Sequence, residues 1–448
     1  MDMKDIVKEF DINAILGENN LTCQCGKRHT VSVKDVVIER GAIARVPGLL
    51  KKYGGSRPFL IADRNTFKAA GEAVCDILSK DKLPYSQFVF EASPEPDEFA
   101  VGQVVMQYDP RCDFILGVGS GTINDICKII AHATGLPYLI VGTAPSMDGY
   151  ASATSSVIQD GIKHSLNTLC PTVIVADLDI MCKAPLRLLQ AGLGDMLAKY
   201  ISICEWRISH LVTGEYYCEE VAALVRGALK KCIAVKDISD MNPETAKPIV
   251  EGLIISGMAM DMAGLSRPAS GTEHYFSHVW DMRSLEFHTP SDLHGIQCGV
   301  GMLLTLKIYQ FIRNIVPSRQ KAMDFVRNFR LDDWNEFLTS FLGKSARGLH
   351  ELEKKDKKYD PEGHKKRLDI ILEHWNDILQ IISEELPDYE QVKQFMQKQG
   401  MPVTPAQLGH SDDEVRDTFI TTKDIRDKYN SSRLLWDLGL LDEGRQYL

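Results

Sequence analysis

The chain has 448 residues, more than one compact core normally holds, so its length predicts two domains. Hydrophobic residues make up 44% and charged residues 25% of it, as in an ordinary globular protein. The net charge of −10 argues against a general nucleic-acid binder, which would carry a basic face. No apolar run reaches the roughly 18 residues of a membrane span, and residues 1–20 are typical of a short amphipathic helix rather than a signal peptide. We therefore expect a cytoplasmic location.

Eleven cysteines are spread through the chain, which predicts thiols in a reducing compartment rather than a disulfide framework. The segment "CQCGKRH" places Cys23, Cys25 and His29 close together. A structural zinc site usually needs a fourth ligand and CxxC-like spacing, and the sequence shows neither. We interpret the segment as a β-hairpin with Gly26 in its turn.

Residues 30–180 alternate short β-rich runs with helical stretches, which predicts βαβ units around a parallel sheet. The predicted strands span 57–63, 85–91, 112–119, 136–143 and 171–179, and the predicted helices span 65–80, 96–108 and 122–135. Asp160-Gly161 lies between two further β-rich runs and predicts a hairpin turn.

After Pro185 the pattern is helical, with periodic stretches at 186–206, 218–238 and 246–265. The highly charged segment 344–366 predicts a solvated helix pair or a mobile excursion. The sequence thus predicts a Rossmann-like α/β nucleotide-binding domain with a parallel sheet over residues 1–185. An all-α metal- and substrate-binding domain is expected over residues 186–448.

The stretch "GVGSGTIND" follows a predicted strand and begins a predicted helix, where a phosphate cradle is expected. It departs from the usual G-x-G-x-x-G pattern, and the alternative is a tight strand-to-helix turn without a ligand. Asp63 ends another predicted strand and is placed to bind an adenosine ribose, which favours NAD over NADP. Its alternative role is that of a helix N-cap, and the two roles are compatible.

Potential metal ligands occur in three separate fragments, which contain Asp195, His274 with His278, and His294. A carboxylate and two imidazoles suit a divalent ion such as zinc, with one coordination position left open for substrate. His274 and His278 lie one helical turn apart, and this spacing leaves open whether both, one or neither binds metal. The metalloprotease motif H-E-x-x-H is excluded, because Tyr275 stands where the glutamate would be.

Taken together, five motifs resemble those of the sn-glycerol-1-phosphate dehydrogenases, in particular their bacterial AraM-like branch. This family belongs to the iron-type alcohol dehydrogenase and dehydroquinate synthase superfamily. The resemblance runs from about residue 35 to 310, with a fainter echo in "DIRDKYNSSRLLWDLGLL". The motifs, in chain order, are "GVGSGTINDICK", "GTAPSMDGYAS", "GLGDMLAKY", "SRPASGTEHYFSH" and "LHGIQCGVG".

The resemblance implies roles for individual residues. The cofactor would be bound by Gly119, Ser120, Gly121, Thr122, Ile123, Thr143, Ala144, Pro145, Ser146 and Ser152, together with Asp63. Asp195, His274 and His294 would hold one zinc, nickel or iron ion. Asp148, Asp195 and His278 would contact substrate and form the catalytic set. NAD(H) is the preferred cofactor with NADP(H) as the second choice, and a homodimer is expected.

Two features of the sequence depart from the family pattern. Pro145 and Met147 replace the alanine and histidine of many relatives, which alters the cofactor wall. The segment after His278 is longer than in archaeal enzymes and adds His288 as a competitor of His294 for the metal. His294 is preferred, because it is followed by glycine and small residues as in the family motif.

The implied reaction is the reversible, metal-assisted reduction of dihydroxyacetone phosphate to sn-glycerol 1-phosphate. Arg267 and Lys163 are candidates to meet the phosphate of this triose. The alternatives are a glycerol or polyol dehydrogenase of the same fold, a dehydroquinate synthase-like lyase, and a non-enzymatic sensor. Neither a nucleic-acid partner nor a membrane span is expected.

Overall fold

The computed structural model describes residues 3, 6–7, 11–17 and 21–448. These residues form two compact units, each built from two stretches of chain. Unit 1 comprises Met1–Met196 and Cys218–Ser266, and unit 2 comprises Leu197–Tyr217 and Arg267–Leu448. Half of the residues of the helix expected within residues 1–20 lie outside the described residues, and α2 (Ile12–Gly17) lies within that segment.

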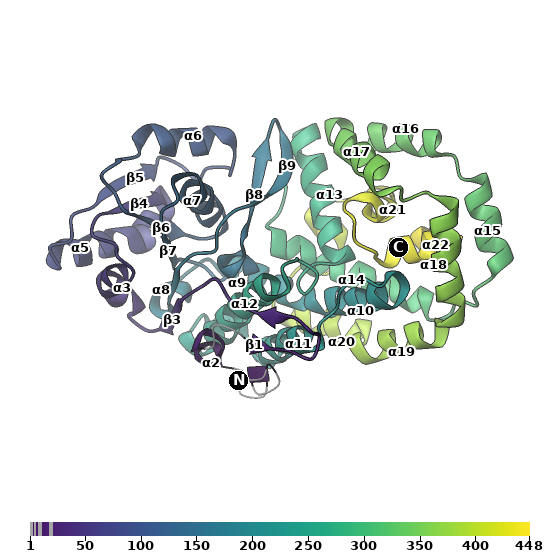
Figure 1. The fold of residues 1–448 in the computed structure, drawn as a ribbon, viewed down its shortest axis with the longest axis horizontal. Coiled ribbons are helices and arrows are strands. Elements are labelled where there is room, and N and C mark those ends of the chain that lie inside the picture. The colour runs from purple at the N-terminus through teal and green to yellow at the C-terminus, as the bar shows by residue number, and fades with distance from the viewer. Residues whose placement is uncertain (1–2, 4–5, 8–10, 18–20) are drawn as a thin grey trace. The chain divides into compact units, whose positions relative to one another are not determined.

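Unit 1 is built around a six-stranded sheet in which all neighbouring strands are parallel (Figure 1). The strand order is β5-β4-β6-β7-β10-β3. The strands are β3 (Asp35–Glu39), β4 (Pro58–Asp63), β5 (Ser86–Phe90), β6 (Phe114–Gly119), β7 (Tyr138–Gly142) and β10 (Val173–Asp177). Every residue of β4, β6, β7 and β10 is buried, as expected for parallel strands covered on both faces. The predicted α/β fold is therefore confirmed.

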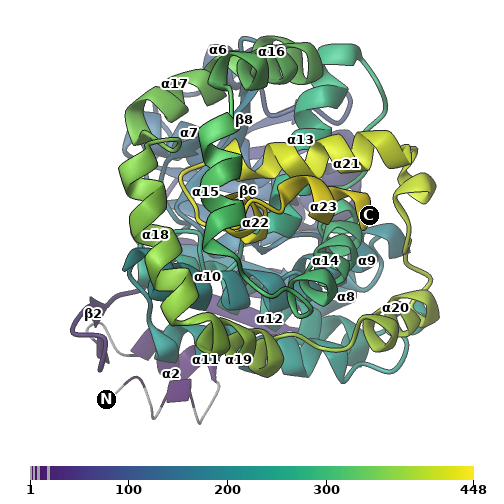
Figure 2. The same cartoon turned by 90° about the vertical axis from the view of Figure 1, so that its right-hand side faces the viewer.

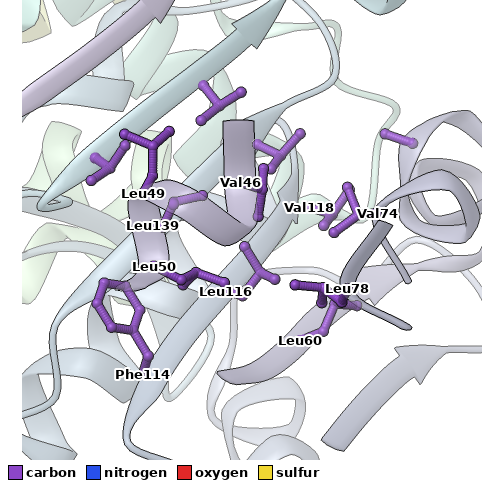
Figure 3. Packing of buried hydrophobic residues seen from close by; sticks show 14 of the residues in the cluster. Val46, Leu49, Leu50, Leu60, Val74, Leu78, Phe114, Leu116, Val118 and Leu139 are labelled. Atoms are coloured by element: carbon purple, nitrogen blue, oxygen red, sulfur yellow. The ribbon is translucent and has the colours of Figure 1, made fainter. Parts of the chain in front are cut away.

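Helices cover both faces of this sheet. On one face, α3 (Val46–Lys52) and α5 (Glu72–Lys80) pack on a core that includes Leu60, Leu116 and Leu139 (Figure 3). On the other face lies α7 (Gly121–Thr134), which approaches the sheet closely at Gly117. The remaining helices of unit 1 are α4 (Arg64–Thr66), α6 (Glu98–Gln107), α8 (Leu178–Met181), α9 (Leu186–Leu197), α11 (Glu219–Ile233) and α12 (Pro243–Ala263). A Cβ at Gly117 would lie 3.0 Å from the sulfur of Cys127, so the glycine permits this approach.

Both predicted hairpins are confirmed. Strands β1 (Leu21–Thr22) and β2 (Arg28–His29) pair antiparallel around a turn in which Gly26 has φ of 83°. Strands β8 (Thr154–Gln159) and β9 (Ile162–Asn167) also pair antiparallel. Their turn residues, Asp160 and Gly161, have φ of 52° and 76°, as a type I′ turn requires.

Unit 2 is helical throughout (Figure 2). Its helices are α10 (Lys199–Thr213), α13 (Thr272–Phe287), α14 (His294–Ile312), α15 (Arg319–Asn328), α16 (Leu331–Leu342), α17 (Ala346–Asp356), α18 (Pro361–Glu373), α19 (Trp375–Glu385), α20 (Tyr389–Lys398), α21 (Asp412–Thr421), α22 (Ser431–Asp437) and α23 (Leu441–Gln446). Among the described residues, α14 alone is long and apolar enough to cross a membrane, and it is a core helix because most of it is buried. The charged segment 344–366 contains α17 and the start of α18, so it is helical, as one of the two expected alternatives has it.

The two units divide the chain differently from the single boundary expected at residue 185. Helices α11 and α12 belong to the unit that contains the sheet. Helix α12 belongs to unit 1 because it approaches the backbone of Asp148 closely at Gly257. A Cβ there would lie 2.7 Å from the Asp148 carbonyl oxygen, so only glycine fits. This close approach packs α12 against the short helix η3 (Asp148–Ala151). Amphipathic periodicity predicts a helix but does not say which partner its apolar face meets.

Candidate active site

The carboxyl edge of the sheet brings Asp63 and Gly119 together at the ends of adjacent strands. Ala62 of β4 pairs with Val118 of β6, so the next residues of the two strands are neighbours. From β4 the chain continues to β5 on one side and later to β6 on the other, so the strand order reverses between β4 and β6. Open α/β sheets bind ligands at such a switch point. Asp63 and Gly119 therefore lie at the switch point of the sheet.

The side chain of Asp63 caps helix α4. Its Oδ1 accepts hydrogen bonds from the backbone N–H of Asn65 at 2.7 Å and of Thr66 at 3.0 Å. The Thr66 hydroxyl in turn accepts from the Asp63 N–H, which completes a capping box. The alternative role foreseen for Asp63 is thus observed, and its contact with a ribose stays a prediction.

The glycine loop leads directly from β6 into α7. A Cβ at Gly119 would lie 2.5 Å from the Cβ of Ile123, so only glycine allows the first helical turn to come this close. Ser120 is the N-cap, and no described side chain caps the helix there. The N–H groups of Gly121, Thr122 and Ile123 therefore begin the helix without a side-chain acceptor, an arrangement that suits an anion.

The loop after β7 is joined to the glycine loop by backbone contacts. The Thr143 N–H donates to the Gly119 carbonyl at 3.1 Å, and the Tyr150 hydroxyl donates to the Ala144 carbonyl at 2.8 Å. Helix α9 packs on the same loop at Gly192, where any Cβ would fall on the carbonyl oxygen of Pro145. The glycines of "AGLGD" thus bring α9, and with it Asp195, against the predicted cofactor loop.

A buried lysine that the sequence analysis did not identify holds this loop in place. Lys128 Nζ donates to the Gly149 carbonyl at 2.6 Å, the Ser152 hydroxyl at 3.1 Å and the Thr154 carbonyl at 2.9 Å. Burial lowers the pKa of Lys128, because it disfavours the ammonium form. The signal in the sequence was the spacing of Lys128 four residues after Asn124, which places both on the buried face of α7.

Two of the predicted catalytic acids meet within unit 1. Asp195 is fully buried, and its Oδ2 accepts a hydrogen bond from the Asp148 N–H at 2.9 Å. Asp148 Oδ2 in turn accepts from the Ser256 hydroxyl of α12 at 2.8 Å. Ser256 is a further residue that the sequence analysis missed, because it lies in an apolar helical stretch far along the chain.

Three of the predicted histidines meet within unit 2. His274 and His278 lie on α13, and His294 is the first residue of α14. The His294 ring centroid is 5.1 Å from that of His274 and 5.9 Å from that of His278. His288, the competing candidate, is exposed at the C-terminal end of α13. The geometry therefore favours His294 over His288.

Hydrogen bonds define the tautomers of His274 and His294. His274 Nδ1 is 2.7 Å from Glu273 Oε1, and a carboxylate can only accept, so Nδ1 carries the proton. His294 Nδ1 is 2.8 Å from the Ser277 hydroxyl, which donates its single proton to Gln297 Oε1 at 2.5 Å. His294 Nδ1 must therefore also donate, and both Nε2 atoms keep the lone pair that a metal requires.

The network beyond His294 continues to a carboxylate. Gln297 Nε2 donates to the Ser291 hydroxyl at 2.8 Å, and that hydroxyl donates to Asp281 Oδ1 at 2.8 Å. Because Gln297 Nε2 donates to Ser291, Gln297 Oε1 faces Ser277 and accepts its proton. The Ser277 oxygen is then left to accept from His294 Nδ1. Glu273, Ser277 and Gln297 were not predicted from the sequence, although each lies within three residues of a predicted histidine.

The residues present in unit 2 fit a divalent metal ion. One ligand atom from each of His274, His294 and Cys298 lies within 4.8 Å of the other two. Cys298 Sγ is 3.5 Å from His294 Nε2 and is an additional potential ligand that the sequence analysis did not consider. Two oriented imidazoles suit zinc, nickel or iron(II). Asp195, the third predicted ligand, belongs to unit 1, and its assignment to the metal stays a prediction.

Arg267 has a structural role rather than the predicted contact with a substrate phosphate. The residue is 1% exposed, and its guanidinium donates to Glu215 Oε1, the Tyr429 carbonyl and the Ser209 hydroxyl at 2.8–3.0 Å. Since its donors are engaged inside unit 2, the prediction for Arg267 is wrong. Lys163, on strand β9, is partly exposed and remains a candidate.

Comparison with known proteins indicates the class of protein to which this chain is similar. Residues 37–185 match the family described as iron-containing alcohol dehydrogenase. The fold is similar to the crystal structure of glycerol dehydrogenase from Schizosaccharomyces pombe, with a TM-score of 0.59 and 18% identity over 93% of this chain and 90% of that one. The matched residues and the fold together point to the class of iron-containing alcohol dehydrogenases.

Two relatives define the family within this class. The glycerol-1-phosphate dehydrogenase (NAD(P)+) of Halalkalibacterium halodurans is 34% identical over 294 residues, which cover 64% of this chain and 74% of that protein. The enzyme of the same name from Geobacillus thermodenitrificans is 30% identical over 397 residues, covering 87% and 89%. The chain therefore belongs to the glycerol-1-phosphate dehydrogenase family of the iron-containing alcohol dehydrogenase superfamily.

Proposed function

We propose that this chain catalyses the reversible, NAD(H)-dependent reduction of dihydroxyacetone phosphate to sn-glycerol 1-phosphate at a divalent metal ion. The observation that carries the proposal is the pair of imidazoles whose Nδ1 protons are fixed by Glu273 and Ser277. Such acceptors behind a histidine are typical of metal sites. The names of the similar relatives support glycerol 1-phosphate as the product and NAD(P) as the cofactor.

The dinucleotide would bind at the switch point of the sheet. The uncapped start of α7 would hold its pyrophosphate, and the loop of Thr143–Ser146 would line its other side. The carboxylate of Asp63 would contact the adenosine ribose and repel a 2′-phosphate, so NAD(H) is preferred and NADP(H) is the second choice. When bound, the nicotinamide supplies the hydride.

The metal would be held by Asp195, His274 and His294. When bound, a zinc, nickel or iron ion acts as a Lewis acid on the substrate carbonyl. Three protein ligands leave a coordination position for that oxygen, so His278 would not be a ligand. His278, one turn along α13 from His274, would instead contact substrate and carry the proton to or from its oxygen.

The remaining residues would position the substrate. Asp148 would contact it with a carboxylate that the Ser256 hydroxyl orients. Lys163 would approach the phosphate, because it is a partly exposed cation on the β8–β9 hairpin. A phosphate partner is the feature that would separate this chain from dehydrogenases of unphosphorylated polyols.

A substrate panel tests the proposal. Purified protein supplied with divalent metal should oxidise NADH with dihydroxyacetone phosphate at least tenfold more efficiently than with dihydroxyacetone. Equal efficiency with the two ketones would indicate a polyol dehydrogenase instead. Turnover of a phosphorylated sugar acid without net NADH consumption would indicate the lyase, because that reaction regenerates its cofactor.

A further inference from the structure

A second cluster of metal-binding side chains lies in unit 1, apart from every residue assigned to catalysis above. The β1–β2 hairpin brings Cys23, Cys25 and His29 to Cys218, the N-cap residue of α11. One ligand atom from each of the four residues lies within 4.8 Å of the others. Near the N-terminus the sequence shows only three of these ligands, and the fold supplies the fourth from 189 residues beyond His29.

Three of the separations within this cluster are close to those around a tetrahedral ion. Cys23 Sγ is 3.4 Å from Cys218 Sγ, and His29 Nε2 is 3.3 Å from Cys25 Sγ and 3.5 Å from Cys218 Sγ. Tetrahedral zinc with ordinary bond lengths separates two sulfurs by about 3.8 Å and a sulfur from a nitrogen by about 3.5 Å. These three separations therefore need to change by only a few tenths of an ångström, and all six lie within 4.8 Å.

The imidazole of His29 is oriented for coordination. It is fully buried, and its Nδ1 lies 2.9 Å from the carbonyl oxygen of Met262. A carbonyl only accepts, so Nδ1 carries the proton and Nε2 presents its lone pair to the sulfurs. A backbone carbonyl that accepts from the other ring nitrogen is common behind metal-binding histidines, so this contact is a second, independent sign of a metal ligand.

We propose that Cys23, Cys25, His29 and Cys218 form a structural zinc site. Three thiolates and one imidazole are a ligand set that selects zinc, and four protein ligands leave no open position for substrate. Each thiol gives up its proton on binding, so three protons are released to solvent for each zinc ion.

The site would fasten the N-terminal hairpin to α11 and α12. A hairpin with two-residue strands is marginal by itself, and here it carries three of the four ligands. Met262, whose carbonyl orients His29, lies on α12, the helix that also carries Ser256 beside Asp148. Zinc binding would therefore stabilise unit 1 without taking part in the reaction.

Elemental analysis of zinc tests the site in protein purified without an affinity tag and kept reduced. Cys218→Ser should carry roughly one zinc per chain less than the wild type. Cys75→Ser is the matched control, because Cys75 is a buried thiol of unit 1 on α5, outside the cluster, and it should keep the full zinc content. Cys25→Ser repeats the test at a partly exposed thiol, in case Cys218→Ser does not fold.

The His294→Ala variant separates this site from the proposed catalytic one. It should retain roughly one zinc per chain and, after exchange for cobalt(II), a thiolate-to-cobalt absorption band that Cys218→Ser and Cys25→Ser lack. Unchanged zinc and an unchanged cobalt spectrum in both cysteine variants would overturn the proposal. A Cys23–Cys218 disulfide in freshly isolated protein would also overturn it.

Discussion

At the scale of single residues, the acceptor at Nδ1 distinguishes His274 and His294 from ordinary buried histidines. Glu273 is a charged acceptor and Ser277 a neutral one, so the two imidazoles are oriented by different means. Glu273 is itself buried near Glu205, and burial together with the Glu273 charge raises the pKa of Glu205. A buried pair of acids is costly for folding, which points to a role of Glu273 in function.

This cost leads to a prediction for Glu273→Gln. The amide can still accept from His274 but lacks the charge that makes the imidazole a stronger ligand, so metal affinity should fall about 10- to 100-fold. The melting temperature should not fall, because the like charge beside Glu205 is removed. Metal competition and thermal unfolding measure the two effects, with Glu286→Gln on the same helix as control. A lower melting temperature with unchanged affinity would assign Glu273 a purely structural role.

The preference for NADH over NADPH tests the predicted contact of Asp63 with the ribose, in a variant that can still cap α4. In Asp63→Ser the hydroxyl can replace the carboxylate as N-cap, while the charge that repels a 2′-phosphate is lost. The ratio of kcat/KM for NADPH to that for NADH should rise at least about tenfold. Asp97→Ser, which alters the N-cap of α6, should leave the ratio unchanged. If Asp63→Ser behaves like this control, Asp63 serves α4 alone.

At the scale of elements, the loop of residues 149–154 depends on one lysine of α7. In Lys128→Met, the Gly149 and Thr154 carbonyls lose a buried donor, which should lower the free energy of unfolding by about 1–3 kcal/mol. The KM for substrate should rise as well, because Asp148 directly precedes the loop. Urea unfolding and steady-state kinetics measure both, with the exposed Lys80→Met as control. Wild-type KM in Lys128→Met would show that the loop keeps its position without this anchor.

Asp125, also on α7, should make the free energy of unfolding depend on pH. Burial raises the pKa of Asp125 to about 6, although Lys128 lies 3.7 Å away. Between its unfolded pKa near 4 and this value, the folded state binds the proton more tightly, so the contribution of Asp125 to stability falls as pH rises. Asp125→Asn should therefore raise the melting temperature relative to wild type more at pH 7 than at pH 5. The same difference at both pH values would contradict the prediction.

At the scale of the whole molecule, each compact unit holds part of the residues that the family resemblance assigns to the reaction. Unit 1 has the glycine loop, Asp63 and the Asp148–Asp195 pair, and unit 2 has the three histidines. The sequence could predict the sheet, because parallel strands buried on both faces are continuous apolar runs. It could also predict the β8–β9 hairpin, because Asp160-Gly161 suits only a few turn types.

Other features depend on contacts between distant residues and could not be predicted from local patterns. Cys218 joins the N-terminal cluster only through the packing of α11, and Arg267 is satisfied by residues as distant as Tyr429. The division into units likewise depends on how α12 meets η3, which its own periodicity does not reveal. Site residues within a recognised motif could be predicted from the sequence. The residues that hydrogen-bond to them could be identified only from the folded structure.

The proposed reduction of dihydroxyacetone phosphate requires a metal ion that His294 binds and His278 does not. The decisive measurement is metal content and NADH-dependent turnover on the same preparations of wild type, His294→Ala and His278→Ala. We predict that His294→Ala binds about one metal ion fewer than wild type and is inactive. His278→Ala should keep its metal and lose most of its turnover. Full metal content and wild-type turnover in His294→Ala, or loss of metal in His278→Ala, would contradict this account.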